Sequence, residues 1–279
     1  MKVLSIDVGI KNLAFCLFEI TESDNPIKII KWDSINISEQ QSFYCIYTDK
    51  CVPCNKPAKY MNNEKHYCLR HAKKQELQIP TIEQKSNFIN KQSLQKLYSI
   101  ANKHMIPLNT NNKIKKSELI ELISNYFTKK YFKAIETINA SDVNLFDIGK
   151  NIKYHFDQIF NNIQCIDHVI IENQIGPIAN RMKTIQGMIV QYFVMSSLEV
   201  KHIEFISSSN KLKCINEPLI KTNYIHRKKL GIEKCLEIIT NENSFHEYIS
   251  LFNSNKKKDD LSDCFLQGYW YIHKKLLIL

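Results

Sequence analysis

Four acidic residues stand where a carboxylate could do chemistry. Asp7 and Glu172 each end a short apolar run, and Asp260 and Asp263 are three residues apart at the start of a helical pattern. Carboxylates at the ends of buried strands are costly unless they are paired, hydrogen-bonded or bound to metal. Oxygen ligands suit Mg²⁺ or Mn²⁺, and two such ions can hydrolyse a phosphodiester. The alternative is that Asp7 forms a turn, Glu172 ends a surface strand, and Asp260 and Asp263 cap a helix.

A group of cysteine and histidine residues gives a second candidate site. Two residues separate Cys51 from Cys54 and Cys68 from His71, and thirteen residues lie between the two pairs. This spacing is typical of a closed tetrahedral site, so it predicts one structural Zn²⁺. Cys45 lies outside the pattern and could be a further ligand; the alternative is a set of unrelated thiols. The remaining cysteines are expected in the core: Cys16, Cys165, Cys214, Cys235 and Cys264.

The elements that position these residues follow from the hydrophobic pattern. Apolar runs at 3–6, 13–18 and 27–35 are joined by short turns and predict an antiparallel meander of three strands. After about residue 139, helical and strand patterns alternate. Helices are expected at 145–163, 181–200, 222–240 and 260–276, and strands at 168–172 and 203–206. The fold class is therefore α/β, with a mixed sheet flanked by helices.

An insert interrupts this fold after the third strand. We expect the core to comprise 1–44 and 140–279. Between them we expect a small zinc-finger-like insert at 45–90 and an α-helical insert with two amphipathic helices at 91–139.

The composition favours a polyanionic partner. The 279 residues include 38 Lys and Arg against 28 Asp and Glu, a net charge of +10 at pH 7. This excess attracts phosphate, although an AT-rich genome would also enrich lysine. No apolar stretch approaches the roughly 18 residues that cross a bilayer, and residues 1–7 are typical of a strand and not of a secretory or transit signal. We therefore expect no membrane partner.

Three motifs resemble those of a known family. They are IDVGIKNLA at 6–14, IENQ at 171–174 and KDDLSDCFLQ at 258–267. In their order and context they resemble the three carboxylate motifs of poxvirus-type Holliday junction resolvases, which are related to bacterial RuvC and to the yeast mitochondrial resolvases. The resemblance covers about 1–40 and 145–279, and it implies an RNase H-like fold for the mixed sheet.

The resemblance also implies which carboxylates are catalytic. Asp7, Glu172, Asp260 and Asp263 match the residues that hold two Mg²⁺ (or Mn²⁺) ions per active site in the family. Asp259 is an extra acidic neighbour and leaves the assignment of Asp260 open by one position.

Lysines at two places are expected to bind DNA. A functional lysine opens the penultimate helix in the family, so Lys229 or Lys228 would contact the scissile phosphate as a catalytic group; the alternative is a solvated basic helix end. The helical insert resembles a SAP domain, a DNA-backbone-binding module of yeast mitochondrial resolvases, but lacks the usual linker glycine. Lys113, Lys115 and Lys116 precede its second helix and would neutralise phosphates. The alternative is a hairpin that only packs on the core.

The expected activity is that of a homodimeric, Mg²⁺-dependent endonuclease that nicks paired strands of four-way DNA junctions. In-line attack by water would leave 5′-phosphate and 3′-hydroxyl ends, as the family implies. The apolar helix at 181–200 is the candidate dimer interface, with a buried core helix as the alternative. Two other functions stay open: an RNase H-like nuclease for RNA–DNA hybrids or rRNA precursors, and a non-catalytic zinc-containing DNA-binding protein. If the chain is viral, as the resemblance suggests, it would act in the cytoplasm of the infected cell.

Overall fold

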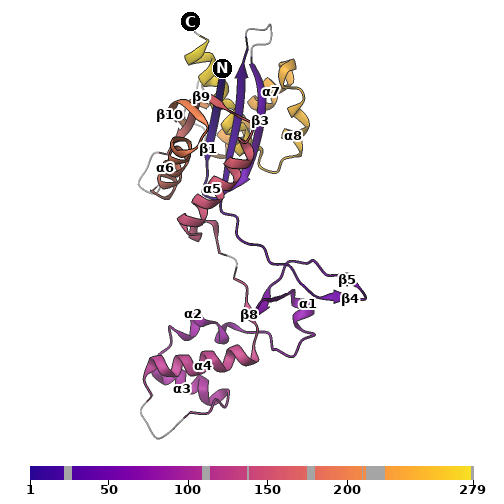
Figure 1. Cartoon of the computed structure of the whole chain (residues 1–279), viewed down its shortest axis with the longest axis vertical. Coiled ribbons are helices and arrows are strands. Elements are labelled where there is room, and N and C mark those ends of the chain that lie inside the picture. The colour runs from indigo at the N-terminus through magenta and orange to yellow at the C-terminus, as the bar shows by residue number, and fades with distance from the viewer. Residues whose placement is uncertain are drawn as a thin grey trace. The chain divides into compact units, whose positions relative to one another are not determined.

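The chain forms two compact units, each described here by itself (Figure 1). The computed structural model describes residues 1–21, 27–108, 114–136, 138–174, 180–208, 210–211 and 224–277. Unit 1 comprises Met1–Glu39 and Asn139–Leu279, and unit 2 comprises Gln40–Ile138.

Unit 1 is built on a five-stranded sheet with the order β10-β9-β1-β2-β3. The strands are β1 (Lys2–Val8), β2 (Asn12–Ile20), β3 (Ile27–Asn36), β9 (Cys165–Asn173) and β10 (Glu199–Ser207). The first three form an antiparallel meander, whereas β9 runs parallel to both β1 and β10. The predicted α/β fold with a mixed sheet is therefore confirmed.

Helices cover both faces of this sheet (Figure 1). One face carries α5 (Leu145–Ile159) and α6 (Asn180–Met195); the other carries α7 (Tyr224–Asn241), α8 (Tyr248–Ser254) and α9 (Lys258–Tyr271), which continues as a π-helical turn at Ile272–Leu276. Along β1, Leu4 and Ile6 face α5 and α6, whereas Val3 faces α9. Both faces are buried, and this is why the central strands are apolar almost throughout.

Strands β9 and β10 are longer than predicted and helix α5 ends earlier, at Ile159, but α6 and α8 differ in ways that the sequence explains. Helix α6 ends at Met195 instead of residue 200, because the chain already enters β10 at Glu199. Helix α8 was not predicted, because its seven residues are too few for a helical period to stand out. Its Phe252 stacks on Trp32 of β3 with ring centroids 5.5 Å apart.

Unit 2 combines a small sheet with a helical hairpin. Its elements are β4 (Thr48–Asp49), β5 (Val52–Pro53), β6 (Tyr60–Asn62), β7 (Lys65–Tyr67), α1 (Leu69–Ala72), a 3-10 helix (Ile82–Gln84), α2 (Ser86–Ile89), α3 (Leu94–Lys103), α4 (Lys116–Lys130) and β8 (Lys133–Ala134). Helices α3 and α4 share a core of buried side chains, and β8 completes a sheet of order β7-β6-β8.

Across the described ranges of both units, no helix has the length and apolar character needed to span a membrane.

Gly268 lets α9 lie directly on β1 and β2. A Cβ atom there would lie 2.3 Å from Cε2 of Phe18 and 3.0 Å from Cβ of Ser5, and both neighbours are fully buried. We expect Gly268→Ala to lower the free energy of unfolding by about 1–3 kcal/mol, because the helix must shift. Gly187→Ala in α6 is the control, since a Cβ there meets nothing within 4 Å. It should raise the free energy by about 0.5–1 kcal/mol. Urea titrations measure both, and equal effects would contradict the prediction.

Candidate active site and metal centre

The candidate active site lies at the edge of the unit 1 sheet where β1 and β9 end. Ile6 pairs with Ile171 in parallel register, so the next residues on the two neighbouring strands are Asp7 and Glu172. Because side chains alternate along a strand, both carboxylates face α9, as Ile170 does. The sheet therefore brings together two of the four predicted carboxylates.

Helix α9 supplies the other two carboxylates. Gln267, one turn beyond Asp263, donates from Nε2 to Oγ of Ser5 and to the carbonyl oxygen of Ile6, both at 3.2 Å. This buried amide fastens α9 to β1 beside Asp7. The first turns of the helix, with Asp260 and Asp263, are thereby held at the same edge of the sheet.

Lys211 lies among these carboxylates. Its Nζ is 2.9 Å from Oδ1 of Asp7, 3.2 Å from Oε2 of Glu172 and 3.1 Å from Oδ2 of Asp263, and its side chain is only 8% exposed. Asp260 instead accepts a hydrogen bond from Nδ2 of Asn12 at 3.5 Å. The three carboxylates thus surround one cation at contact distance.

The cluster carries more negative charge than one ammonium offsets. Burial raises the pKa of Glu172 to about 8, and its hydrogen bond with Asp7 adds to this rise. Burial acts on Asp7 in the same direction, but the Lys211 ammonium and the hydrogen bond with Glu172 hold the pKa of Asp7 below its usual value. Burial also raises the pKa of Asp260 and of Asp263. Without a further cation, Glu172 therefore retains a proton near neutral pH.

Hard oxygen donors in this number suit a divalent cation. The ammonium of Lys211 shows that a cation fits at this position, because the carboxylates of Asp7, Glu172 and Asp263 all form ion pairs with it. The donor set therefore fits Mg²⁺ or Mn²⁺, as the sequence predicts.

Lys211 was missed in the sequence, although a signal exists. It follows the strand at 203–206 by five residues, and β10 runs parallel to β9. The carboxyl ends of parallel strands meet at one edge of a sheet, so a lysine just beyond β10 is close to Glu172. No pattern rule singles out such a loop lysine without the register of the sheet.

The two candidate lysines of α7 lie in different surroundings. Nζ of Lys228 is 2.5 Å from Oδ2 of Asp259, and its charge acts on the pKa of Asp7 and Asp263. Lys229 pairs with Glu233 of its own helix at 3.6 Å and is largely exposed. The geometry therefore favours Lys228 over Lys229 as the lysine beside the acidic cluster. The two neighbouring acidic residues also have different partners: Asp259 pairs with Lys228, whereas Asp260 accepts a hydrogen bond from Asn12.

A second cluster lies in unit 2. The ligand atoms of Cys45, Cys54, Cys68 and His71 all lie within 4.8 Å of one another. Nδ1 of His71 is 3.3 Å from Sγ of Cys45 and 3.5 Å from Sγ of Cys68. Sulfur ligands of a tetrahedral zinc ion lie about 3.8 Å apart, given Zn–S distances of about 2.3 Å. Burial lowers the pKa of His71, which favours the neutral imidazole that binds metal.

The cluster differs from the predicted zinc set in one member. Cys51 is exposed and lies outside the group, at a turn between β4 and β5 with φ of 67°. Cys45 takes its place, because its N–H donates to the carbonyl oxygen of Lys56 and this pairing carries it beside Cys54. The geometry therefore favours Cys45 over the predicted Cys51 as the fourth member of the cluster. Among the other cysteines, Cys16, Cys235 and Cys264 are buried, Cys165 is partly buried, and Cys214 lies outside the described residues.

The predicted DNA-binding lysines of unit 2 are on the surface where they are described. Lys115 and Lys116 are exposed at the start of α4, whereas Lys113 lies outside the described residues. The structure therefore leaves Lys115 and Lys116 accessible to a phosphate backbone.

Known proteins resemble the chain over nearly its whole length. An uncharacterized protein of Acanthamoeba polyphaga mimivirus is 26% identical over 317 residues, which cover 98% of this chain and 74% of the relative. Among solved structures, the fowlpox virus resolvase in complex with its Holliday junction substrate is 16% identical, with a TM-score of 0.42 and 99% of each chain covered. The yeast mitochondrial Holliday junction resolvase Ydc2 is 13% identical, with a TM-score of 0.43, 97% of this chain and 78% of that chain covered.

The family described as mitochondrial resolvase Ydc2 / RNA splicing MRS1 matches residues 3–175. The match spans more than half of the chain and includes the strand ends that carry Asp7 and Glu172. The resemblance to resolvases is thereby confirmed, and the chain belongs to the mitochondrial resolvase Ydc2 / RNA splicing MRS1 family.

Proposed function

We propose that the chain is a metal-dependent endonuclease that resolves four-way DNA junctions. The observation that carries this proposal is the convergence of Asp7, Glu172 and Asp263 on one cation, with Asp260 beside them. Membership of a family that includes a resolvase supports the choice of DNA junctions as the substrate.

The four carboxylates would hold two Mg²⁺ or Mn²⁺ ions, which would activate a water and stabilise the leaving oxygen of the phosphodiester. Within the chain, Gln267 keeps Asp263 in register with Asp7 through its bonds to β1. Lys228, which pairs with Asp259, would contact the phosphate that is cut.

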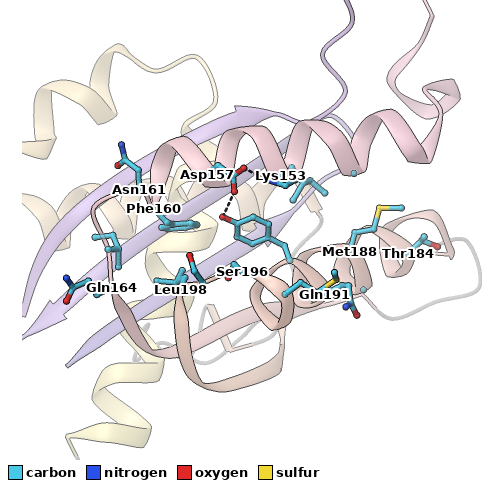
Figure 2. A pocket seen from close by; sticks show the side chains of 17 residues that line it. Lys153, Asp157, Phe160, Asn161, Gln164, Thr184, Met188, Gln191, Ser196 and Leu198 are labelled. Atoms are coloured by element: carbon cyan, nitrogen blue, oxygen red, sulfur yellow. Dashed lines mark hydrogen bonds and ion pairs between the residues drawn. The ribbon is translucent and has the colours of Figure 1, made fainter.

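A homodimer would give the two active sites that a two-fold symmetric junction requires. Helices α5 and α6 frame a groove of about 1140 Å³, which Figure 2 shows with Lys153, Asp157 and Met188 along it. Exposed apolar side chains stand on the same helices, among them Val194 at 68% and Met195 at 76% exposed. Ile189 and Phe193 face the core, so only part of the apolar surface of α6 is available to a partner.

The proposal also covers a structural zinc ion and the cellular location of the protein. We propose one structural Zn²⁺ per chain in unit 2, at the cluster of three cysteines and one histidine. The mimivirus relative supports a viral origin and action in the cytoplasm of an infected cell.

A substrate panel at fixed salt tests the proposed activity. We expect Mg²⁺-dependent, paired nicks in a synthetic four-way junction, and little cleavage of linear duplex. The family description also names an RNA splicing protein, so an RNA–DNA hybrid and a structured RNA belong in the panel. If either RNA substrate is cleaved in preference to the junction, that RNA is the substrate and the proposal of a junction is wrong. If no member of the panel is cleaved, the alternative of a non-catalytic DNA-binding protein is favoured.

The carboxylates should act as one group. We expect Asp7→Asn, Glu172→Gln, Asp260→Asn and Asp263→Asn each to reduce cleavage about a hundredfold or more, because each removes charge that holds the metal. Asp167→Asn is the control, since Asp167 lies on β9 but pairs with Lys201 away from the cluster. Single-turnover cleavage rates measure the effect. If Asp259→Asn abolishes cleavage and Asp260→Asn does not, the register on α9 is wrong by one residue.

Lys211 should stabilise the protein only while the divalent metal is absent. Lys211→Met leaves three partly buried carboxylates without their cation, and we expect a loss of about 3 kcal/mol in chelator. Mn²⁺ should then raise the melting temperature of the variant more than that of the wild type. Lys201→Met removes an exposed ion pair with Asp167 and should cost under about 1 kcal/mol. If Mn²⁺ raises the melting temperature of Lys211→Met and of the wild type equally, Lys211 and the metal do not compete for the same carboxylates.

The exposed end of α6 should hold the dimer together. Replacing both Val194 and Met195 by Glu puts charge on the proposed apolar interface, and we expect dissociation to monomers in sedimentation velocity. Replacing Ile225, which is 77% exposed on α7, by Glu is the control and should leave the dimer intact. A wild-type monomer at micromolar concentration, or a dimer that survives the double substitution, would exclude this interface.

A further inference from the structure

The excess positive charge of the chain lies entirely in unit 2. Residues 40–138 contain seventeen Lys and Arg against seven Asp and Glu, which equals the net charge of +10 of the whole chain. Unit 1 contains twenty-one of each sign and is neutral. Long-range attraction to a nucleic-acid backbone is therefore a property of unit 2.

Strand β8 joins the two halves of unit 2. It directly follows α4 and pairs with β6, where Tyr60 lies opposite Ala134. Backbone bonds flank this pairing: the N–H of Phe132 donates to Gln78 at 3.0 Å and that of Ile135 donates to Lys59 at 2.9 Å. The end of the helical hairpin is therefore anchored in the small sheet whose strand β7 ends next to Cys68.

The side chain of Phe132 connects β8 with the Cys/His cluster. Its ring contacts the rings of Tyr67 and Tyr60, with centroids 5.6 Å and 6.2 Å away. Phe132 belongs to the same small core as Cys45 and Cys68, which has only five buried members. So small an apolar core cannot hold a sheet by itself, whereas four metal–ligand bonds can.

We propose that a zinc ion bound by Cys45, Cys54, Cys68 and His71 holds β8 and the end of α4 in place, and thereby sets the affinity of unit 2 for a nucleic-acid backbone. This inference rests on the proposed function and deepens it. It names the part of the chain that binds the substrate and the ion on which this binding depends.

The basic residues near β8 are placed for this role. Lys129 on the last turn of α4 and Lys133 in β8 are exposed and make no ion pair with any residue of the described ranges. Lys133 also lines a groove of about 400 Å³ between β6 and α4, together with the polar side chains of Asn62, Ser124 and Thr128. Loss of β8 from the sheet would remove Lys133 from this groove and release the end of α4.

The test compares two cysteine-to-serine variants in the full chain. Asp7→Asn is present in every sample, and DNA binding is measured without Mg²⁺, so that cleavage plays no part. We expect Cys45→Ser to reduce zinc from one ion per chain to none, and to weaken binding of a four-way junction at least about tenfold. The slope of log affinity against log salt should fall by about 0.9 for each phosphate that the variant no longer neutralises. Cys51→Ser is the matched control and should change neither zinc content nor affinity.

Hydrogen exchange shows whether the effect acts through β8. Loss of zinc should speed exchange at the amides of Phe132 and Ile135, while the amides of β1 and β2 stay protected. Removing zinc from the wild-type cysteine set with a chelator and restoring it should reverse the change in affinity, which separates a local effect from misfolding.

Three outcomes would overturn the inference. Zinc loss in Cys51→Ser but not in Cys45→Ser would show that the ligand set is wrong. Zinc loss with unchanged affinity and salt slope would show that the ion does not govern binding, and unchanged exchange at Phe132 and Ile135 would remove β8 as the link. The same titrations with a linear duplex keep this result separate from the proposed function, because backbone binding can depend on zinc whether or not junctions are the substrate.

Discussion

Carboxylates that lie together in a buried position repel one another, and unit 1 is arranged to hold them there. The parallel register of β1 and β9 makes Asp7 and Glu172 neighbours, and α9 adds Asp263 to the same edge. The cation at their centre, Lys211, lowers the cost of this arrangement, but burial and the hydrogen bond with Asp7 still raise the pKa of Glu172. A group of carboxylates that holds a proton when no further cation is present is suited to divalent metal, which can take the place of that proton.

The packing of α9 follows from that requirement. A carboxylate on a helix reaches a strand end only if the helix lies close to the sheet, and Gly268 removes the side chain that would prevent this. Gln267 then replaces apolar packing with two directed hydrogen bonds to β1. Together, one residue without a side chain and one buried amide fix the distance on which the geometry of Asp7 and Asp263 depends.

The sequence allowed the core and its carboxylates to be predicted because both depend on local patterns. Continuous apolar runs indicate strands buried on both faces, and an acidic residue at the end of such a run is conspicuous. Cys45 and Lys211 are different, because long-range contacts decide their positions. Backbone pairing of Cys45 with Lys56 brings its thiol beside Cys54, while Cys51 is exposed at a turn and lies outside the cluster. Lys211 reaches Glu172 through the parallel pairing of β10 with β9, which no spacing rule in the sequence expresses.

The separation of charge between the two units has a physical reason in the same acidic cluster. Lysines near buried carboxylates pair with them, as Lys211 does with three and Lys228 does with Asp259. More lysines there would compete with divalent metal for the same oxygens, and each would raise the cost of metal binding. Placing the excess positive charge in unit 2 attracts phosphate without that competition. A chain that needs both a negative metal site and a negative substrate thus keeps its excess of positive charge in unit 2, whereas the lysines of unit 1 are balanced by an equal number of acidic residues.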